Sequence, residues 1–74
     1  MKNIVTDFMQ TLLSLDRLSA KQMLDNHTRQ ITPIKFIETI AVPALERIGD
    51  DWEKGNLALS QIYMSGRICE ELID

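Results

Sequence analysis

The chain of 74 residues is short of several residue types, and each shortage excludes a class of protein. Its single cysteine cannot form an internal disulfide, which excludes a small scaffold held by cross-links. Lysine and arginine total 8 against 11 for aspartate and glutamate, so no basic patch supports binding to nucleic acid or to an anionic membrane. No apolar run approaches the roughly 20 residues of a membrane span, and a signal peptide's apolar block is missing. We therefore predict a cytoplasmic protein.

Aromatic residues are also few, at 5% of the chain, but apolar residues reach 45%. That apolar content is too high for a disordered chain and sufficient for one small core. The sequence contains no Asn-Gly or Gly-Gly hairpin turn and no alternation of apolar and polar residues typical of strands. Apolar residues instead recur at helical spacing almost throughout. The sequence predicts an all-α fold, a small antiparallel four-helix bundle with short loops.

The first two helices are predicted from apolar stripes and capping residues. The first spans about Lys2 to Ser14, and its stripe consists of Ile4, Val5, Phe8, Met9, Leu12 and Leu13. Asp16 or Ser19 can accept hydrogen bonds from the free N–H groups at the start of a short second helix, which ends near His27. The apolar residues of that helix are Leu18, Met23 and Leu24.

The third helix begins at Thr32-Pro33, because threonine is a good N-cap and proline suits the first helical position. Pro43 lies inside it, where a proline removes one backbone bond, so we expect a kink or break there. Gly55 can adopt the left-handed conformation that ends a helix. The apolar stripe of the third helix comprises Ile34, Ile37, Ile40, Ala41, Ala44, Leu45, Ile48 and Trp52.

The fourth helix begins near Leu59 or Ser60, and its apolar positions are Leu59, Ile62, Gly66, Cys69 and Ile73. No glycine or proline stops it before Asp74. A domain boundary usually has a cap or linker, so we predict that residues 1–74 form one domain of a longer protein.

No set of residues resembles a catalytic site. His27 lies at a predicted helix C-terminus, where an imidazole is favourable, and no other ligand stands at a metal spacing from it. Cys69 has no neighbouring base or cation, so it is interpreted as a small core residue. The pairs Asp50-Asp51 and Glu70-Glu71 are interpreted as solvated, because adjacent residues on a helix point about 100° apart.

The segment from Ile48 to Gln61 is unusual. Gly49 interrupts a helical pattern at a cost of about 1 kcal/mol relative to alanine, which indicates that another group approaches its backbone. The turn at Gly55 brings the end of one helix close to the start of the next. We therefore predict an apolar platform at one end of the bundle, formed by Trp52, Leu59 and Ile62 with Tyr63 beside them. The alternative is an ordinary core at a bundle end.

One stretch of the chain resembles the signature of the helical cap module that precedes B12-binding domains. It reads Pro43-Ala44-Leu45-Glu46-Arg47-Ile48-Gly49-Asp50-Asp51-Trp52-Glu53-Lys54-Gly55-Asn56. That pattern is proline, small, apolar, two variable residues, apolar, glycine, two variable residues, aromatic, glutamate, basic, glycine and acidic. The predicted helices upstream fit the same module. The resemblance covers nearly the whole chain and is most specific between Pro43 and Gln61.

The resemblance implies that one end of the bundle lies over the upper face of a corrin ring and shields the ligand on cobalt. The expected cofactor is cobalamin, and the residues that match the family's usual contacts are Trp52, Leu59, Ile62 and Tyr63. Apolar side chains there exclude water from a cobalt–carbon bond. The implied partners are a Rossmann-like B12-binding domain, which would hold most of the cofactor, and cognate methyltransferases; an exposed apolar end also predicts a homodimer.

Two departures refine the resemblance. Light-sensing cobalamin regulators of this family carry Glu-His where this chain has Ile62-Tyr63, whereas methyltransferase corrinoid proteins carry two apolar residues, often followed by methionine, as Met64 follows here. The family's lower-ligand motif, Asp-x-His-x-x-Gly, is absent, and the surroundings of His27 do not match it. The sequence therefore favours a non-catalytic cap of a methyl carrier. A cobalamin-dependent regulator and a structural bundle without ligand are the alternatives.

Overall fold

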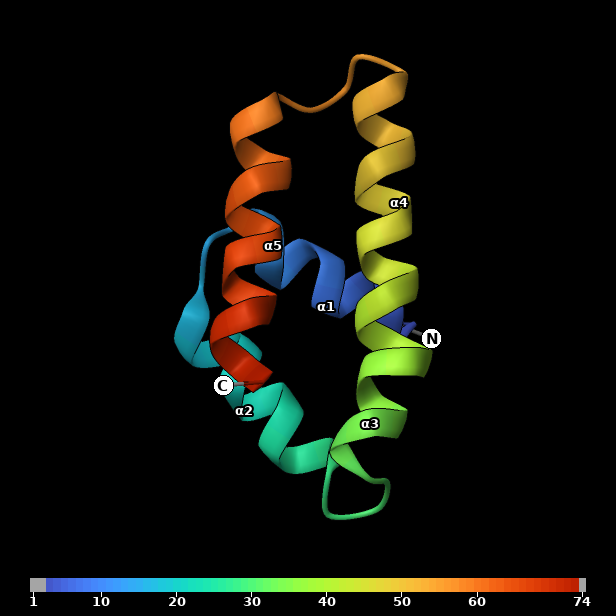
Figure 1. Cartoon of the computed structure of the whole chain (residues 1–74), viewed down its shortest axis with the longest axis vertical. Coiled ribbons are helices and arrows are strands. Elements are labelled where there is room, and N and C mark those ends of the chain that lie inside the picture. Colours follow the sequence, from blue (N-terminus) through green and yellow to red (C-terminus); the bar gives the residue numbers. More distant parts are fainter. Residues whose placement is uncertain (1–2, 74) are drawn as a thin grey trace.

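Four helices make up the fold in the computed structural model, which describes residues 3–73 without the side chain of Ile73 (Figure 1). They are α1 (Ile4–Leu13), α2 (Arg17–His27), a long helix, and α5 (Leu59–Ile73). The long helix joins α3 (Pro33–Phe36), the π-helical segment η1 (Ile37–Ala41) and α4 (Val42–Glu53). No strand occurs within residues 3–73. The predicted all-α fold with four helices is confirmed, while Lys2, Asp74 and the side chain of Ile73 lie outside the described residues.

The helix starts are capped as the sequence predicts. The Asp16 carboxylate accepts from the backbone N–H of Ser19 at 3.0 Å and from its hydroxyl at 2.6 Å, and these bonds, the hydroxyl's first, lower the pKa of Asp16. Thr32 accepts from the N–H of Lys35 at 3.1 Å, with Pro33 in the first turn. The residues near both helix starts are thus held by local bonds rather than by long-range packing.

The helix ends use one motif twice. At the end of α4, the N–H of Gly55 donates to the carbonyl of Trp52 and the N–H of Asn56 donates to Asp51, both at 2.9 Å. This is the Schellman arrangement, with Gly55 at φ 81°. The end of α1 has the same pair of bonds, but Leu15 takes the left-handed position at φ 57°. A side chain is unfavourable in that conformation, so α1 ends in a strained cap.

Pro43 disturbs the long helix through its hydrogen-bond register, and the helix runs on as one piece. A proline in an α-helix clashes with the carbonyl one turn back and has no N–H to donate. Directly before it, the N–H of Val42 donates to the carbonyl of Ile37, five residues earlier, as in a π-helix. The wider turn of η1 gives the proline ring room, so Thr32 and Trp52 stay connected by a continuous helix.

The core lies where α1 and α2 pack against the long helix and α5. Figure 1 shows α5 antiparallel to α4, with α1 crossing behind the pair and α2 beside the C-terminal half of α5. The rings of Phe8 and Phe36 meet edge to face with centroids 5.2 Å apart. The buried apolar residues are Phe8, Leu12, Ala20, Leu24, Phe36, Ile40, Ala41, Ala44, Ile48 and Ile68. We use the name packed half for the part of the molecule that consists of these buried residues together with α1, α2 and α3.

Three predicted stripes require correction. In the long helix Phe36 is buried and Ile34 is exposed, because the π turn inserts one residue and shifts the inward face upstream of it. In α5, Ser65 and Ile68 are fully buried while Leu59 is exposed. The Ser65 hydroxyl donates to the carbonyl of Gln61 at 2.7 Å, so the buried polar group is satisfied inside its own helix. Leu18 of α2 is also exposed rather than part of a core stripe.

The helices of the described residues are too short or too polar to cross a membrane.

Candidate functional site

The junction between α4 and α5 is fixed by local hydrogen bonds at both sides. The Gly55 cap ends α4, and three residues separate Gly55 from the start of α5 at Leu59. There the side-chain oxygen of Gln61 accepts from the N–H of Ala58 at 2.8 Å, which satisfies a free donor at the helix start. The loop is therefore short and well bonded, and it holds the last turn of α4 beside the first turns of α5 (Figure 1).

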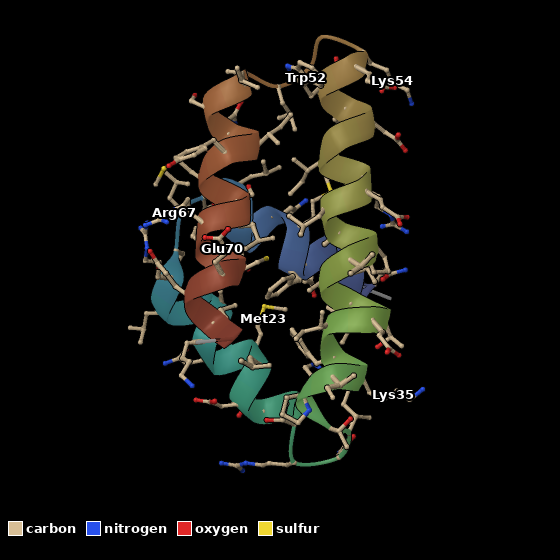
Figure 2. All side chains as sticks on the ribbon, viewed as in Figure 1. Met23, Lys35, Trp52, Lys54, Arg67 and Glu70 are labelled. Carbon is tan, nitrogen blue, oxygen red and sulfur yellow. The ribbon has the colours of Figure 1, made fainter. Side chains whose placement is uncertain are left out.

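All four predicted site residues lie at this junction, which we call the loop end: Trp52 on the last turn of α4, and Leu59, Ile62 and Tyr63 on the first turns of α5. Figure 2 shows Trp52 on the side of α4 toward α5, with Lys54 directed away from it. Trp52 is 45% exposed, Leu59 65% and Tyr63 64%. Ile62 is half-buried and packs against the core. The structure thus places the four residues near one end of the bundle, where three of them are exposed and Ile62 is half-buried.

The part of the loop end that follows α4 carries no formal charge. From Gly55 to Gly66 the sequence contains no lysine, arginine, histidine, aspartate or glutamate. The nearest charges stand on α4, where Asp50, Asp51, Glu53 and Lys54 flank Trp52. Exposed apolar surfaces that gather in one place often mark binding sites.

The structure has open space over two glycines and a cavity beside one of them. From the sequence we expected another group close to the Gly49 backbone, and we missed the space at Gly66 and the cavity. A Cβ added to Gly49 or to Gly66 would have no heavy atom of the described chain within 4 Å beyond its immediate neighbours. Gly66 opens into a cavity of about 220 Å³ between the long helix and α5. Its other lining residues are Phe8, Leu24, Phe36, Ile37, Ala41, Val42, Leu45, Cys69, Glu70 and Leu72. The signal in the sequence was the small residues Ala41 and Gly66 on two helices that face each other.

The remaining candidates have structural surroundings. Burial raises the pKa of the Cys69 thiol to about 11, so the thiolate is disfavoured and the side chain is a poor nucleophile. His27 is the last residue of α2, and its ring lies 6.0 Å from that of Phe36 in the packed half. No group of three possible metal ligands occurs in the part of the chain that the structure describes.

The comparison with protein families decides the interpretation of the loop end. A family model described as a B12 binding domain matches residues 4–74. The chain belongs to the helical cap family of cobalamin-binding proteins. No curated protein and no solved structure gives a match. Domains of this family bind the cofactor, are not catalytic by themselves, and typically pair with a Rossmann-like B12-binding domain. The resemblance inferred from the run Pro43 to Asn56 is thereby confirmed.

Proposed function

We propose that this cap covers the upper face of a corrinoid, mainly held by a Rossmann-like partner domain, and shields a cobalt-bound methyl group while partner methyltransferases exchange it. The observation that supports the proposal is a set of exposed apolar side chains at one end of a member of the cobalamin cap family. Its contact residues would be Trp52, Leu59, Ile62 and Tyr63. The cofactor supplies the cobalt–carbon chemistry, and the chain supplies its enclosure.

The chemistry of these four side chains fits an enclosing role. An indole, two branched aliphatic groups and a phenol ring present wide apolar surface, which excludes water from a reactive bond. None of the four is a carboxylate or imidazole that would compete for cobalt. Ile62-Tyr63 stand where light-sensing relatives would carry Glu-His, and this difference favours a methyl carrier over a light-dependent regulator.

The test compares two leucine-sized residues of equal exposure in the cobalamin-loaded protein. Leu59 is 65% exposed at the loop end, and Ile34 is 67% exposed at the start of the long helix. We expect Leu59→Ala and Trp52→Ala to shorten the lifetime of the methyl–cobalt bond against light and water, and Ile34→Ala to leave it unchanged. Unchanged lifetimes in both loop-end variants, with the protein folded, would reject the enclosing role.

The isolated chain provides a second measurement. We expect weak binding of methylcobalamin and no methyl transfer, because the motif for a lower histidine ligand is absent from residues 1–74. Titration followed by the visible spectrum measures this affinity. Submicromolar binding with a histidine-on spectrum would show that a histidine of this chain, necessarily His27, ligates cobalt.

The same surface predicts that the isolated chain self-associates. Without a corrinoid, the exposed side chains of Trp52, Leu59 and Tyr63 can bury area against a second copy. Sedimentation velocity at rising concentration should show a dimer that Leu59→Ala weakens and Ile34→Ala does not. A concentration-independent monomer would remove the homodimer from the list of partners.

A further inference from the structure

Gly49 lacks the two common reasons for a glycine inside a helix. It is in the regular part of α4, and its backbone does not take the left-handed conformation that Gly55 requires. No neighbouring element packs tightly on it either, because an added Cβ would meet no heavy atom of residues 3–73 within 4 Å. Since alanine is the better helix former, the described chain itself gives no advantage to glycine at this position.

The open space over Gly49 continues the surface of the loop end. Residues three and four apart on a helix are neighbours on one side, so Gly49 lies beside Trp52 and Leu45. At 1.5 Å per residue, Gly49 is about 4.5 Å along the helix axis from Trp52. Trp52 is exposed and Gly49 is half-buried. A flat ligand resting on Trp52 would therefore extend over the α4 backbone at Gly49.

We propose that Gly49 is a positioning residue of the corrinoid site: its missing side chain lets the rim of the bound ring lie against the α4 backbone, one turn from Trp52. This inference rests on the proposed function, and it adds to the corrinoid site a residue that acts through its lack of a side chain. A methyl group at position 49 would stand between ring and helix and hold the ring away from Trp52. Gly49→Ala should then stabilise the α4 helix and weaken the binding of the corrinoid.

Gly66→Ala is the matched control. Gly66 is also inside a helix and also has open space around an added Cβ, but it lines the cavity with Phe36 and Leu72 rather than the surface beside Trp52. In the 74-residue chain we expect both substitutions to raise the Tm by about 4–8 °C, since each gains helix propensity without a clash. A lower Tm for Gly49→Ala would show that the space is not free and would overturn the proposal.

The deciding measurement is the release of methylcobalamin from the loaded protein that contains this cap and its corrinoid-binding domain, followed by visible absorbance after gel filtration. We expect release about tenfold faster for Gly49→Ala and unchanged for Gly66→Ala, because overpacking one contact by a methyl group weakens binding by about this factor. Equal release rates for the parent protein and Gly49→Ala overturn the proposal. Equal acceleration by both substitutions also overturns it, because the effect would then follow helix stiffness rather than position.

Trp52→Ala separates this inference from the function on which it rests. If Trp52→Ala accelerates release and shortens the bond lifetime while Gly49→Ala does neither, the role of Gly49 alone is wrong. If Trp52→Ala also changes neither quantity in folded protein, the enclosing function of the loop end is wrong.

Discussion

The packed half and the loop end of this small bundle place their aromatic residues in opposite surroundings. In the packed half, Phe8 and Phe36 are enclosed by four helices and contact each other edge to face. At the loop end, Trp52, Leu59 and Tyr63 are each between 45% and 65% exposed. Seven large apolar side chains of the described residues are at least 42% exposed, and three of them, including both exposed aromatic residues, lie at the loop end. In a domain this small, aromatic residues that are left in solvent indicate a surface kept for binding rather than for stability.

The largest expected effect is a loss of stability when a core aromatic residue of the packed half is removed. Phe36→Ala should cost about 3–5 kcal/mol, which would unfold most of a domain this small. Trp52→Ala should cost only about 1–1.5 kcal/mol, because roughly half of its surface is already in water. Urea denaturation followed by circular dichroism measures both. Equal losses would mean that the loop end is part of the stabilising core.

The next largest effect concerns the Schellman caps that end α1 and α4. Leu15→Gly should stabilise the chain by about 1 kcal/mol, because Leu15 occupies the left-handed position that glycine adopts without strain. Gly55→Ala should destabilise it by about the same amount, since it introduces that strain at the loop end. Thermal melts of both variants test the pair. The same sign for both changes would contradict the shared geometry.

Cys69 lies on the cavity wall, and its thiol makes the stability of the chain depend on pH. Its pKa is raised by burial from 9.0 to about 11, so the protonated thiol is favoured in the folded state. The stability that this thiol contributes is fully present below pH 9 and is lost as the pH rises through about 11. A disulfide reagent should react slowly at neutral pH and faster in urea. Equal rates in folded and unfolded chain would place Cys69 at the free surface.

The smallest effect concerns the ion pair that ties the start of α2 to the end of α5. Arg17 Nε lies 2.7 Å from a Glu71 carboxylate oxygen, and both side chains are nearly half exposed. We expect Arg17→Ala to lower stability by about 0.5 kcal/mol, and less at high salt, because solvent screens the pair. Lys21→Ala, within one helix turn of α2, is the control for a local pair. A salt-independent loss would indicate packing by the Arg17 stem instead.

Local signals in the sequence predict most of the fold. The caps at Asp16, Thr32 and Gly55 depend on residues within one turn of each other, so they can be read without knowing the tertiary structure. The burial of Phe36 could not be read this way. It depends on one residue inserted by the π turn before Pro43, and periodicity analysis assumes a constant 3.6 residues per turn.

The position of the four residues and the exposed apolar character of this end were predicted from the sequence, but the degree to which each side chain is exposed was not. Spacing across Gly55 places Trp52 and Leu59 at one end, and the structure has them there. Their exposure depends on which faces α1 and α2 leave uncovered, and this is a property of the whole assembly of helices. The cavity beside Gly66 was missed for the same reason, because its walls come from α1, α2, the long helix and α5 together.

The unbroken run from Pro33 to Glu53 makes the long helix a lever. Its 21 residues span about 30 Å, comparable with the 36 Å length of the molecule. A tilt of about 10° at the Thr32 end would sweep the Trp52 end through about 5 Å, enough to uncover or close a small ligand without unfolding any turn. A helix broken at Pro43 would absorb such a tilt at the break. The π turn that lets the chain pass this proline thus keeps the Thr32 end and the Trp52 end on one helix, so we expect a movement of one end to be accompanied by a movement of the other.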